Sequence, residues 1–368
     1  MDNPFIFGKA VEGDHFVDRE QEIDELQSTL IAGQHVVLFS PRKMGKTSLI
    51  KETFRKTKGE TCIHIDLWQT PSQYALAKEI LNKVINQTYT SVEKLGHDLK
   101  DLFRSLRPKI YIDMDGHIGI EFNREETVEA LKEILDFPER VAQKKNIRLI
   151  IAFDEFQEIE RLDGLQMEKL FRSILQHHEK VSYIFAGSER SLITIIFESK
   201  SRPFYRFAKH MELQPINKEI LEKFVTNKFV QSSKKIDKNA AQWIVEFSKG
   251  IPYYVQHLAH EIWYMTKTEA NLETIKTCLI ERIIPSLSSG FQTIWNRIKS
   301  DEQKRVLIGI ANETHPQVYS QEFIKKYDLK SPSHVRKAIK SLEGIELLEK
   351  NTVWDPFFKE WIKMNFSL

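Results

Sequence analysis

The chain has 368 residues, of which 41% are hydrophobic and 29% charged, so its length predicts two or three units in a globular protein. Its 54 basic and 52 acidic side chains nearly cancel, which gives nucleic-acid binding no overall support but leaves room for a local basic face. Two cysteines exclude a disulfide framework, and neither a signal peptide nor a membrane-spanning run is apparent, so we expect a cytoplasmic protein that makes no membrane contact.

The first 214 residues have the pattern of a parallel α/β sheet. Apolar residues at helical spacing predict an amphipathic surface helix over 18–30. Short apolar runs that alternate with helical stretches then predict parallel strands. These runs lie at 35–39, 61–67, 149–153, 181–186 and 210–213. An insertion at 109–122 alternates apolar and polar residues around Asp115-Gly116, which predicts a β-hairpin attached to the sheet domain.

The rest of the chain predicts two further domains. From Ile216 the pattern is helical, with a break where Gly250 ends one helix and Pro252 opens the next. After about Pro285, three short helices and two short strands predict a winged helix. The helices are expected at 302–311, 321–327 and 333–342, and the strands at 346–350 and 351–355. We therefore expect a sheet domain at 1–214, a helical domain at 215–285 and a winged-helix domain at 286–368.

The segment SPRKMGKTS, residues 40–48, follows the first predicted strand and opens a helix, as a phosphate-binding P-loop does. In such a loop, backbone N–H groups at the helix N-terminus cradle phosphates. Lys46 is predicted to reach the β and γ phosphates of ATP, and the Thr47 hydroxyl to bind Mg²⁺. The other residues predicted to contact the nucleotide from this loop are Arg42, Lys43, Met44, Gly45 and Ser48. Ser40 stands where the full pattern has its first Gly.

Asp154 and Glu155 follow the third predicted strand, in the form of a Walker B sequence. The Asp154 carboxylate is predicted to hold Mg²⁺, and Glu155 to polarise the attacking water as a general base. An acidic pair after an apolar strand is common on protein surfaces. Its combination with the P-loop indicates a nucleotide site, because open α/β sheets bind ligands beyond the carboxyl ends of their strands.

Two further residues are candidates for catalysis. Ser188 follows the fourth predicted strand and is predicted to sense the γ-phosphate; an ordinary strand-end turn is the alternative. Arg206 precedes the last strand and is predicted to be an arginine finger for a neighbouring subunit, which implies a homo-oligomer. A surface salt bridge is the alternative, and Arg202 and Arg190 are weaker candidates.

The sequences FVDRE, SPRKMGKTSL, AFDEFQEI, FAGSERSL and GIPYYVQHL resemble the archaeal-type ATPases of the AAA+/STAND superfamily over nearly the whole chain. The resemblance implies an α/β P-loop AAA+ core with a parallel sheet, an all-α lid and a C-terminal winged helix. It also implies that the backbone near Val17, Asp18 and Arg19 and the corner from Gly250 to Pro252 pack against adenine, and that Arg206 is the likelier finger. The lid sequence GIPYYVQ contains no arginine, although many members carry one there, so slow hydrolysis is expected, which suits a switch better than a motor.

Cations follow one face of the helix predicted at 333–342. Arg336, Lys337 and Lys340 are candidates for DNA contact, since this helix of a winged helix can enter the major groove. A solvated basic face on a domain that binds protein is the alternative. Three functions remain open: an ATPase switch, an ATP-gated DNA-binding regulator and a nucleotide-binding scaffold without hydrolysis. A guanine-reading Asn-Lys-x-Asp motif is missing, which argues against a GTPase, and the adjacent His177 and His178 are expected to be structural or surface residues.

Overall fold

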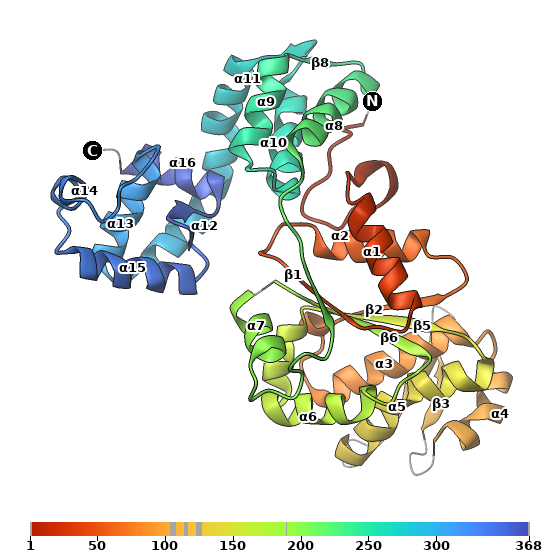
Figure 1. Cartoon of the computed structure of the whole chain (residues 1–368). Helices are drawn as coiled ribbons and strands as arrows, with labels where there is room; N and C mark the ends of the chain where they lie inside the picture. Colours follow the sequence, from red (N-terminus) through yellow and green to blue (C-terminus); the bar gives the residue numbers. More distant parts are fainter. Residues whose placement is uncertain (1, 104–107, 114–116, 123–126, 189, 367–368) are drawn as a thin grey trace. The chain divides into compact units, whose positions relative to one another are not determined.

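The computed structural model describes residues 2–103, 108–113, 117–122, 127–188 and 190–366. The chain forms two compact units (Figure 1). The first is Ala10–Gln214, and the second consists of Pro215–Leu368 together with the residues up to Lys9. The N-terminal residues therefore pack with the helical part of the chain rather than with the sheet.

The first unit is built on a five-stranded parallel sheet in the order β2-β5-β6-β1-β7. Its strands are β1 (Val36–Phe39), β2 (Thr61–Asp66), β5 (Leu149–Asp154), β6 (Val181–Gly187) and β7 (Lys209–Glu212). All five predicted strands are present, each within two residues of its expected ends. Every residue of β5 and β6 is buried, as expected for central strands that are covered on both faces.

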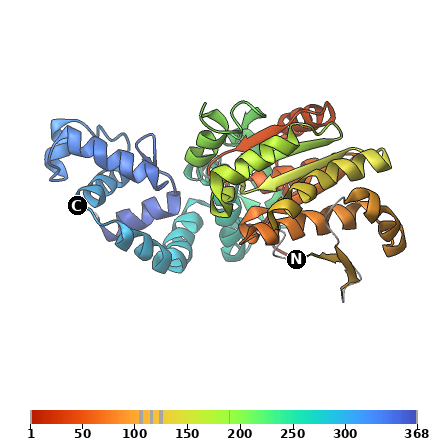
Figure 2. The same ribbon diagram turned by 90° about the horizontal axis from the view of Figure 1, so that it is seen from below.

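Helices cover both faces of this sheet, as Figures 1 and 2 show. On one face, α1 (Glu20–Ile31) and α2 (Lys46–Lys56) pack against alternate residues of the strands, including Leu38 and Ile184. The larger core lies on the other face. The helical elements on that side and at the strand ends are η2 (Leu67–Gln69), α3 (Gln73–Thr88), α4 (Val92–Leu102), α5 (Thr127–Lys145), η4 (Phe156–Leu162), α6 (Gly164–Leu175) and α7 (Arg190–Glu198).

The predicted hairpin is present as β3 (Lys109–Ile112) paired with β4 (Ile118–Glu121). Two asparagines of α3 hold β4: Asn86 exchanges hydrogen bonds with the backbone of Ile118, and Asn82 accepts one from Ile120. The hairpin is thus attached to the sheet domain. Its expected Asp115-Gly116 turn lies outside the described residues.

The second unit begins with the helical region. Its elements are α8 (Lys218–Gln231), α9 (Lys238–Phe247), α10 (Pro252–Met265), α11 (Leu272–Cys278), a π-helical turn η5 (Leu279–Ile283) and α12 (Ile284–Arg297). The strands β8 (Lys235–Ile236) and β9 (Glu269–Ala270) add a short parallel pair that we did not predict. The N-terminal segment packs on these helices: Phe5 is buried against Phe229, and the Phe7 ring stacks on His257.

The winged helix follows α12 after a short extended segment, with Ser300 as the N-cap of its first helix. It contains α13 (Asp301–Asn312), α14 (Gln321–Lys326), α15 (Pro332–Gly344), the wing strands β10 (Leu348–Glu349) and β11 (Thr352–Val353), and α16 (Pro356–Asn365). Pro285, near which we predicted a domain boundary, lies in the first turn of α12, inside the continuous helical run of α11, η5 and α12. None of the helices in the described ranges has the length and apolar character needed to span a bilayer.

Candidate nucleotide-binding site

The predicted site residues come together at the carboxyl edge of the sheet. Phe39, the last residue of β1, pairs with Gly187, the last residue of β6, so the loop from Ser40 and the side chain of Ser188 leave the sheet at the same level. Asp154 ends the next strand, β5. Ligands of open parallel sheets bind at this edge.

The loop at 40–48 places the N-terminus of α2 over this edge. Gly45 is the N-cap and has φ +89°, a conformation that favours glycine, whereas an added Cβ would meet no atom within 4 Å. Lys46 is buried, and its ammonium donates hydrogen bonds to the Ser40 carbonyl at 2.9 Å and the Pro41 carbonyl at 3.4 Å. Arg42 and Lys43 are exposed. The Lys46 cation is therefore held against the carbonyls at the start of the loop.

Thr47 and Asp154 meet although 107 residues separate them. The Thr47 hydroxyl donates to Asp154 Oδ2 at 2.6 Å, and His64 Nε2 lies 3.2 Å from the same oxygen. Burial raises the pKa of Asp154, but the hydrogen bonds from His64 and Thr47 outweigh it, and the pKa falls below its usual value. Asp154 is thus an ionised carboxylate beside a hydroxyl oxygen, a donor pair that suits Mg²⁺.

Glu155 lies directly after Asp154 and turns toward Ser188. The Ser188 hydroxyl is buried and donates to Glu155 Oε2 at 2.6 Å. Two residues of this site escaped sequence reasoning. His64 faces Asp154 only because β2 pairs with β5, and Gln157 reaches Glu155 through the η4 turn; neither belongs to a pattern that a single sequence reveals.

The segment 17–19, whose backbone is predicted to lie against adenine, is held in place by the Arg19 side chain. Asp18 and Arg19 both have positive φ values, and the buried Arg19 guanidinium donates to Glu22 and to the Gln214 carbonyl at 2.7 Å each. Pro252 lies at the first turn of α10, in the second unit. The placing of adenine beside these residues stays a prediction.

The arginine candidates differ sharply in their surroundings. Arg202 donates to Glu160 and to Glu168, whose side chain is fully buried, so its charge is neutralised within the chain. Arg206 is exposed, has φ +54°, and forms no ion pair with any described residue. It lies over the Tyr205 ring at 5.2 Å. Arg190 begins α7. Comparing Arg202 with Arg206, only the Arg206 guanidinium is exposed and outside an ion pair with a described residue, so it is the one available to another molecule.

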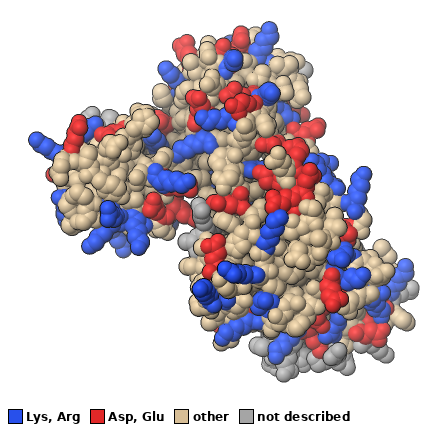
Figure 3. All heavy atoms as spheres, viewed as in Figure 1, with Lys and Arg blue, Asp and Glu red and all other residues tan. Residues whose placement is uncertain are grey.

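The basic helix predicted in the winged helix is α15. Val335, Ile339 and Leu342 are buried as expected, and the exposed side carries Arg336, Lys337 and Lys340. Lys and Arg side chains gather over this part of the surface in Figure 3. No described carboxylate pairs with these three cations.

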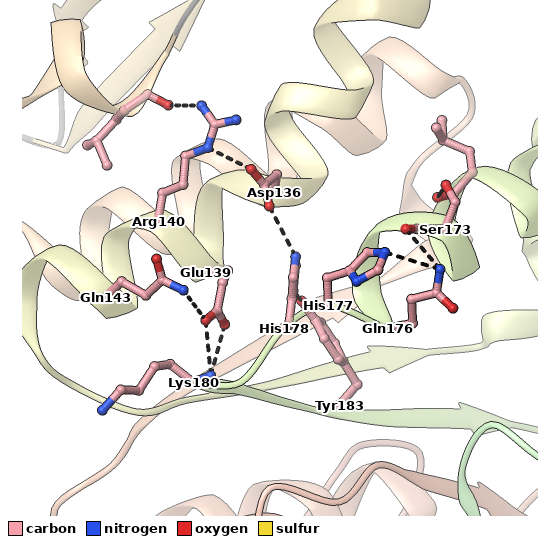
Figure 4. Close-up of polar contacts among 12 residues, drawn as sticks. Asp136, Glu139, Arg140, Gln143, Ser173, Gln176, His177, His178, Lys180 and Tyr183 are labelled. Carbon is pink, nitrogen blue, oxygen red and sulfur yellow. Dashed lines mark hydrogen bonds and ion pairs between the residues drawn. The ribbon is translucent and has the colours of Figure 1, made fainter.

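His177 and His178 are separated as expected for neighbours on a helical turn. Figure 4 shows His178 pointing inward, where its Nδ1 lies 2.7 Å from the Tyr183 hydroxyl and its Nε2 3.5 Å from Asp136 Oδ1. His177 lies on the surface beside Gln176. The pair does not converge on a common point, and the network around His178 joins α5, α6 and β6.

Residues 16–258 match the model of a family described as an ATPase domain predominantly from Archaea. The chain belongs to this ATPase family. In this archaeal-type ATPase, residues 289–364 also match the model of a probable winged helix domain. No curated protein matches the chain.

Solved structures similar to this archaeal-type ATPase confirm the predicted fold class. A Walker-type ATPase of Pyrococcus abyssi is 18% identical, with a TM-score of 0.68 over 98% of this chain and 99% of that one. The ORC2 protein of Aeropyrum pernix, in ADPNP and ADP complexes, is 12% identical, with a TM-score of 0.57 over 100% and 98%. The ORC1 protein of the same organism, in complex with DNA, is 12% identical, with a TM-score of 0.51 over 96% and 94%. The fold is an α/β domain with a parallel sheet, followed by helices and a winged helix.

Proposed function

We propose that this ATPase-family chain binds ATP with Mg²⁺ at residues 40–48, hydrolyses it slowly, and acts as a nucleotide-driven conformational switch. The observation that carries the proposal is the 2.6 Å hydrogen bond between Thr47 and Asp154. It brings the two Mg²⁺ donors of a P-loop site together from distant parts of the sequence. Glu155, Ser188 and Lys46 lie beside them at the same sheet edge.

Phosphate binding would use the loop and the first turn of α2. The amides of residues 42–48 and the helix dipole favour the triphosphate, and Lys46 would exchange its bonds to Ser40 and Pro41 for phosphate oxygens. A bound Mg²⁺ would neutralise charge on the β and γ phosphates. Thr47 and Asp154 would hold it, and their oxygens are of the hard type that Mg²⁺ requires.

For hydrolysis, Glu155 is the candidate base. It would accept a proton from water as the water oxygen bonds to the γ-phosphorus and the bond from that phosphorus to the ADP oxygen breaks. Lys46 would fix the γ-phosphate, and Ser188 would contact it from the neighbouring strand. Arg206 of another copy would offset the developing charge. The lack of an arginine in residues 250–256 supports slow turnover.

The test compares ATP binding and turnover of the wild type with those of Glu155→Gln and Lys46→Ala. We expect Glu155→Gln to bind ATP without turnover, because the base is lost while the loop is intact. Lys46→Ala should lose binding, because one cation on the phosphates is removed. Wild-type turnover no faster than that of Glu155→Gln would overturn the assignment and favour a nucleotide-gated scaffold.

A second function, ATP-gated DNA binding, is favoured by one observation, the exposed cations Arg336, Lys337 and Lys340 on α15. Duplex DNA affinity should fall steeply with salt if these cations replace condensed counterions. The triple alanine variant should then bind weakly and with a shallower salt slope. The matched control replaces three exposed lysines of the helical region, Lys218, Lys223 and Lys267, by alanine. Equal loss in both variants would argue against a specific role of α15.

A further inference from the structure

The side chain of Gln157 is buried next to the candidate base. Gln157 is 2% exposed, and its Nε2 donates to Glu155 Oε2 at 2.5 Å. Because Ser188 donates to the same oxygen at 2.6 Å, Oε2 is held by two donors. The other carboxylate oxygen of Glu155, Oε1, accepts no hydrogen bond from a described residue.

The position of Gln157 is fixed by the turn that carries it. Glu155 has φ +51° and ψ +46° and is the N-cap of η4, so the chain reverses toward β6 directly after the base. Phe156, between the two polar residues, is fully buried, with its ring 4.8 Å from that of Phe185 and 5.4 Å from that of Phe204. A rigid aromatic anchor therefore sets the distance from Gln157 to Glu155.

The strand opposite leaves space for the Gln157 amide. A Cβ on Gly187 would stand 2.7 Å from Gln157 Oε1 and 2.3 Å from Ile193 Cγ1, closer than such contacts allow. Gln157 Oε1 itself is buried without a hydrogen-bond partner among the described residues. A buried unpaired acceptor destabilises the fold, so packing alone would favour an apolar side chain here. A glutamine donates here to Glu155 Oε2 at 2.5 Å and, at 3.4 Å, to the Ser188 hydroxyl that bonds the same carboxylate, and an apolar residue can make neither bond.

We propose that Gln157 is a positioning residue for Glu155: it holds Oε2 and leaves Oε1 directed at the water that attacks ATP. This inference rests on the proposed function of Glu155 as the base. Ser188 and Gln157 both donate a hydrogen bond to Oε2, but their side chains differ in rotational freedom. Ser188 can rotate its hydroxyl toward a γ-phosphate, whereas Gln157 is packed on the η4 turn and keeps the carboxylate in place when Ser188 turns away.

The experiment measures kcat and KM for ATP in Gln157→Met, which keeps the volume of the side chain and removes its donor. We expect kcat to fall about tenfold to a hundredfold, the range for a lost hydrogen bond to a charged group, with KM and ATP affinity unchanged. Gln157→Glu, which sets a carboxylate against a carboxylate, should lose at least as much. The matched control is Gln73→Met: Gln73 donates to the Leu162 carbonyl at 3.0 Å, so it supports the same turn without touching Glu155.

A double-mutant cycle separates positioning from a structural role. If Gln157 acts through Glu155, Gln157→Met should cause no further loss of the slow residual hydrolysis that a single-turnover assay with labelled ATP detects in a Glu155→Gln background. A full second loss there, or a drop in Gln73→Met as large as in Gln157→Met, would overturn the inference and leave Glu155 as the base. Full turnover by a folded Gln157→Met variant would overturn it as well. A wild type no faster than Glu155→Gln would overturn the proposed function and this inference together, whereas the other results reject the inference alone.

Discussion

At the scale of single residues, His35 shows how the fold fixes a protonation state. It precedes β1, and its Nδ1 accepts a hydrogen bond from the Tyr183 backbone N–H at 3.3 Å. Its ring also packs 4.7 Å from that of Phe207. Burial lowers the pKa of His35 to about 4, with smaller contributions from the charges of His178 and Arg172. A protonated Nδ1 could not accept the bond from Tyr183.

This makes stability depend on pH in a defined window. Because the pKa of His35 in the folded state, about 4, is below the ordinary value of 6.5, the unfolded chain binds the proton first as the pH falls. Stability is thus fully present above pH 6.5 and declines toward pH 4, by on the order of 2 kcal/mol at pH 5 for this group. Urea unfolding at pH 7.5 and pH 5 should show that His35→Phe loses less stability on acidification than the wild type. His177→Gln, at an exposed histidine, should keep the wild-type difference; an unchanged difference in His35→Phe would contradict the explanation.

Single residues of the site were predictable where their signal is local. Lys46 and Thr47 lie in one loop sequence, and Asp154 and Glu155 follow one apolar strand, so a few neighbouring residues were enough to predict them. His64 and Gln157 needed the structure, since their partners are set by strand pairing and by a turn with positive φ at Glu155. The bond between the Arg19 guanidinium and the Gln214 carbonyl also needed the structure, because 195 residues separate the two partners.

At the scale of elements, the corner between α9 and α10 depends on one glycine. Gly250 has φ +71°, and a Cβ there would lie 2.7 Å from the carbonyl oxygen of Ile216. Its own carbonyl accepts a hydrogen bond from the Ile216 N–H at 3.0 Å. Pro252 then starts α10 at a position where a missing N–H is harmless. The corner is therefore both a helix end and the attachment point of the chain that enters the second unit.

We expect Gly250→Ala to destabilise the protein by about 2 kcal/mol or more, because left-handed backbone strain adds to the clash with Ile216. The control is Gly290→Ala in α12, where a Cβ meets nothing within 4 Å. That change should stabilise by roughly 0.5–1 kcal/mol through helix propensity. Urea unfolding of both variants checks the pair, and equal effects of the same sign would refute the argument.

Elements were predicted where periodicity is long and missed where it is short. The strands of the sheet and the winged-helix elements were found, since apolar runs and helical spacing span enough residues. The strands β8 and β9 have two residues each, too few to show the alternating pattern of a strand in the sequence. They form because they pair with each other in the folded chain. Pro285, near which we predicted a domain boundary, lies in the first turn of α12 after a π-helical segment, and Pro138 lies within α5.

At the scale of the whole molecule, the place of Arg206 in the sheet decides which copy it could serve if it is the proposed arginine finger. It lies three residues before β7, whose first residue pairs with Val36 at the start of β1. The phosphate loop follows Phe39 at the other end, one four-residue strand of about 13 Å away. Arg206 is thus at the amino edge of the sheet, and the candidate site is at the carboxyl edge. A finger here would have to act on another copy.

Mixing variants tests this directly. Lys46→Ala retains Arg206 but loses its own phosphate site, and Arg206→Ala retains the site but loses the finger. Turnover should be low for each alone and should recover when the two are mixed. A mixture of Lys46→Ala with Glu155→Gln should stay inactive, because both lack a working site. A mixture of the first pair that is no faster than its components would exclude a finger in trans.

The helical region and the winged helix are joined by close contacts. Lys249 donates to the Val353 carbonyl at 2.5 Å, the Phe357 ring packs against those of Tyr254 and His257, and one helical run continues from α11 into α12. Because buried rings pack across this contact, we expect the helical region and the winged helix to move together. If nucleotide turns the helices of this unit, α15 turns through the same angle and travels in proportion to its distance from the pivot. Since coupling free energies are reciprocal, a ligand that binds α15 would then change the affinity of the nucleotide site by the same factor.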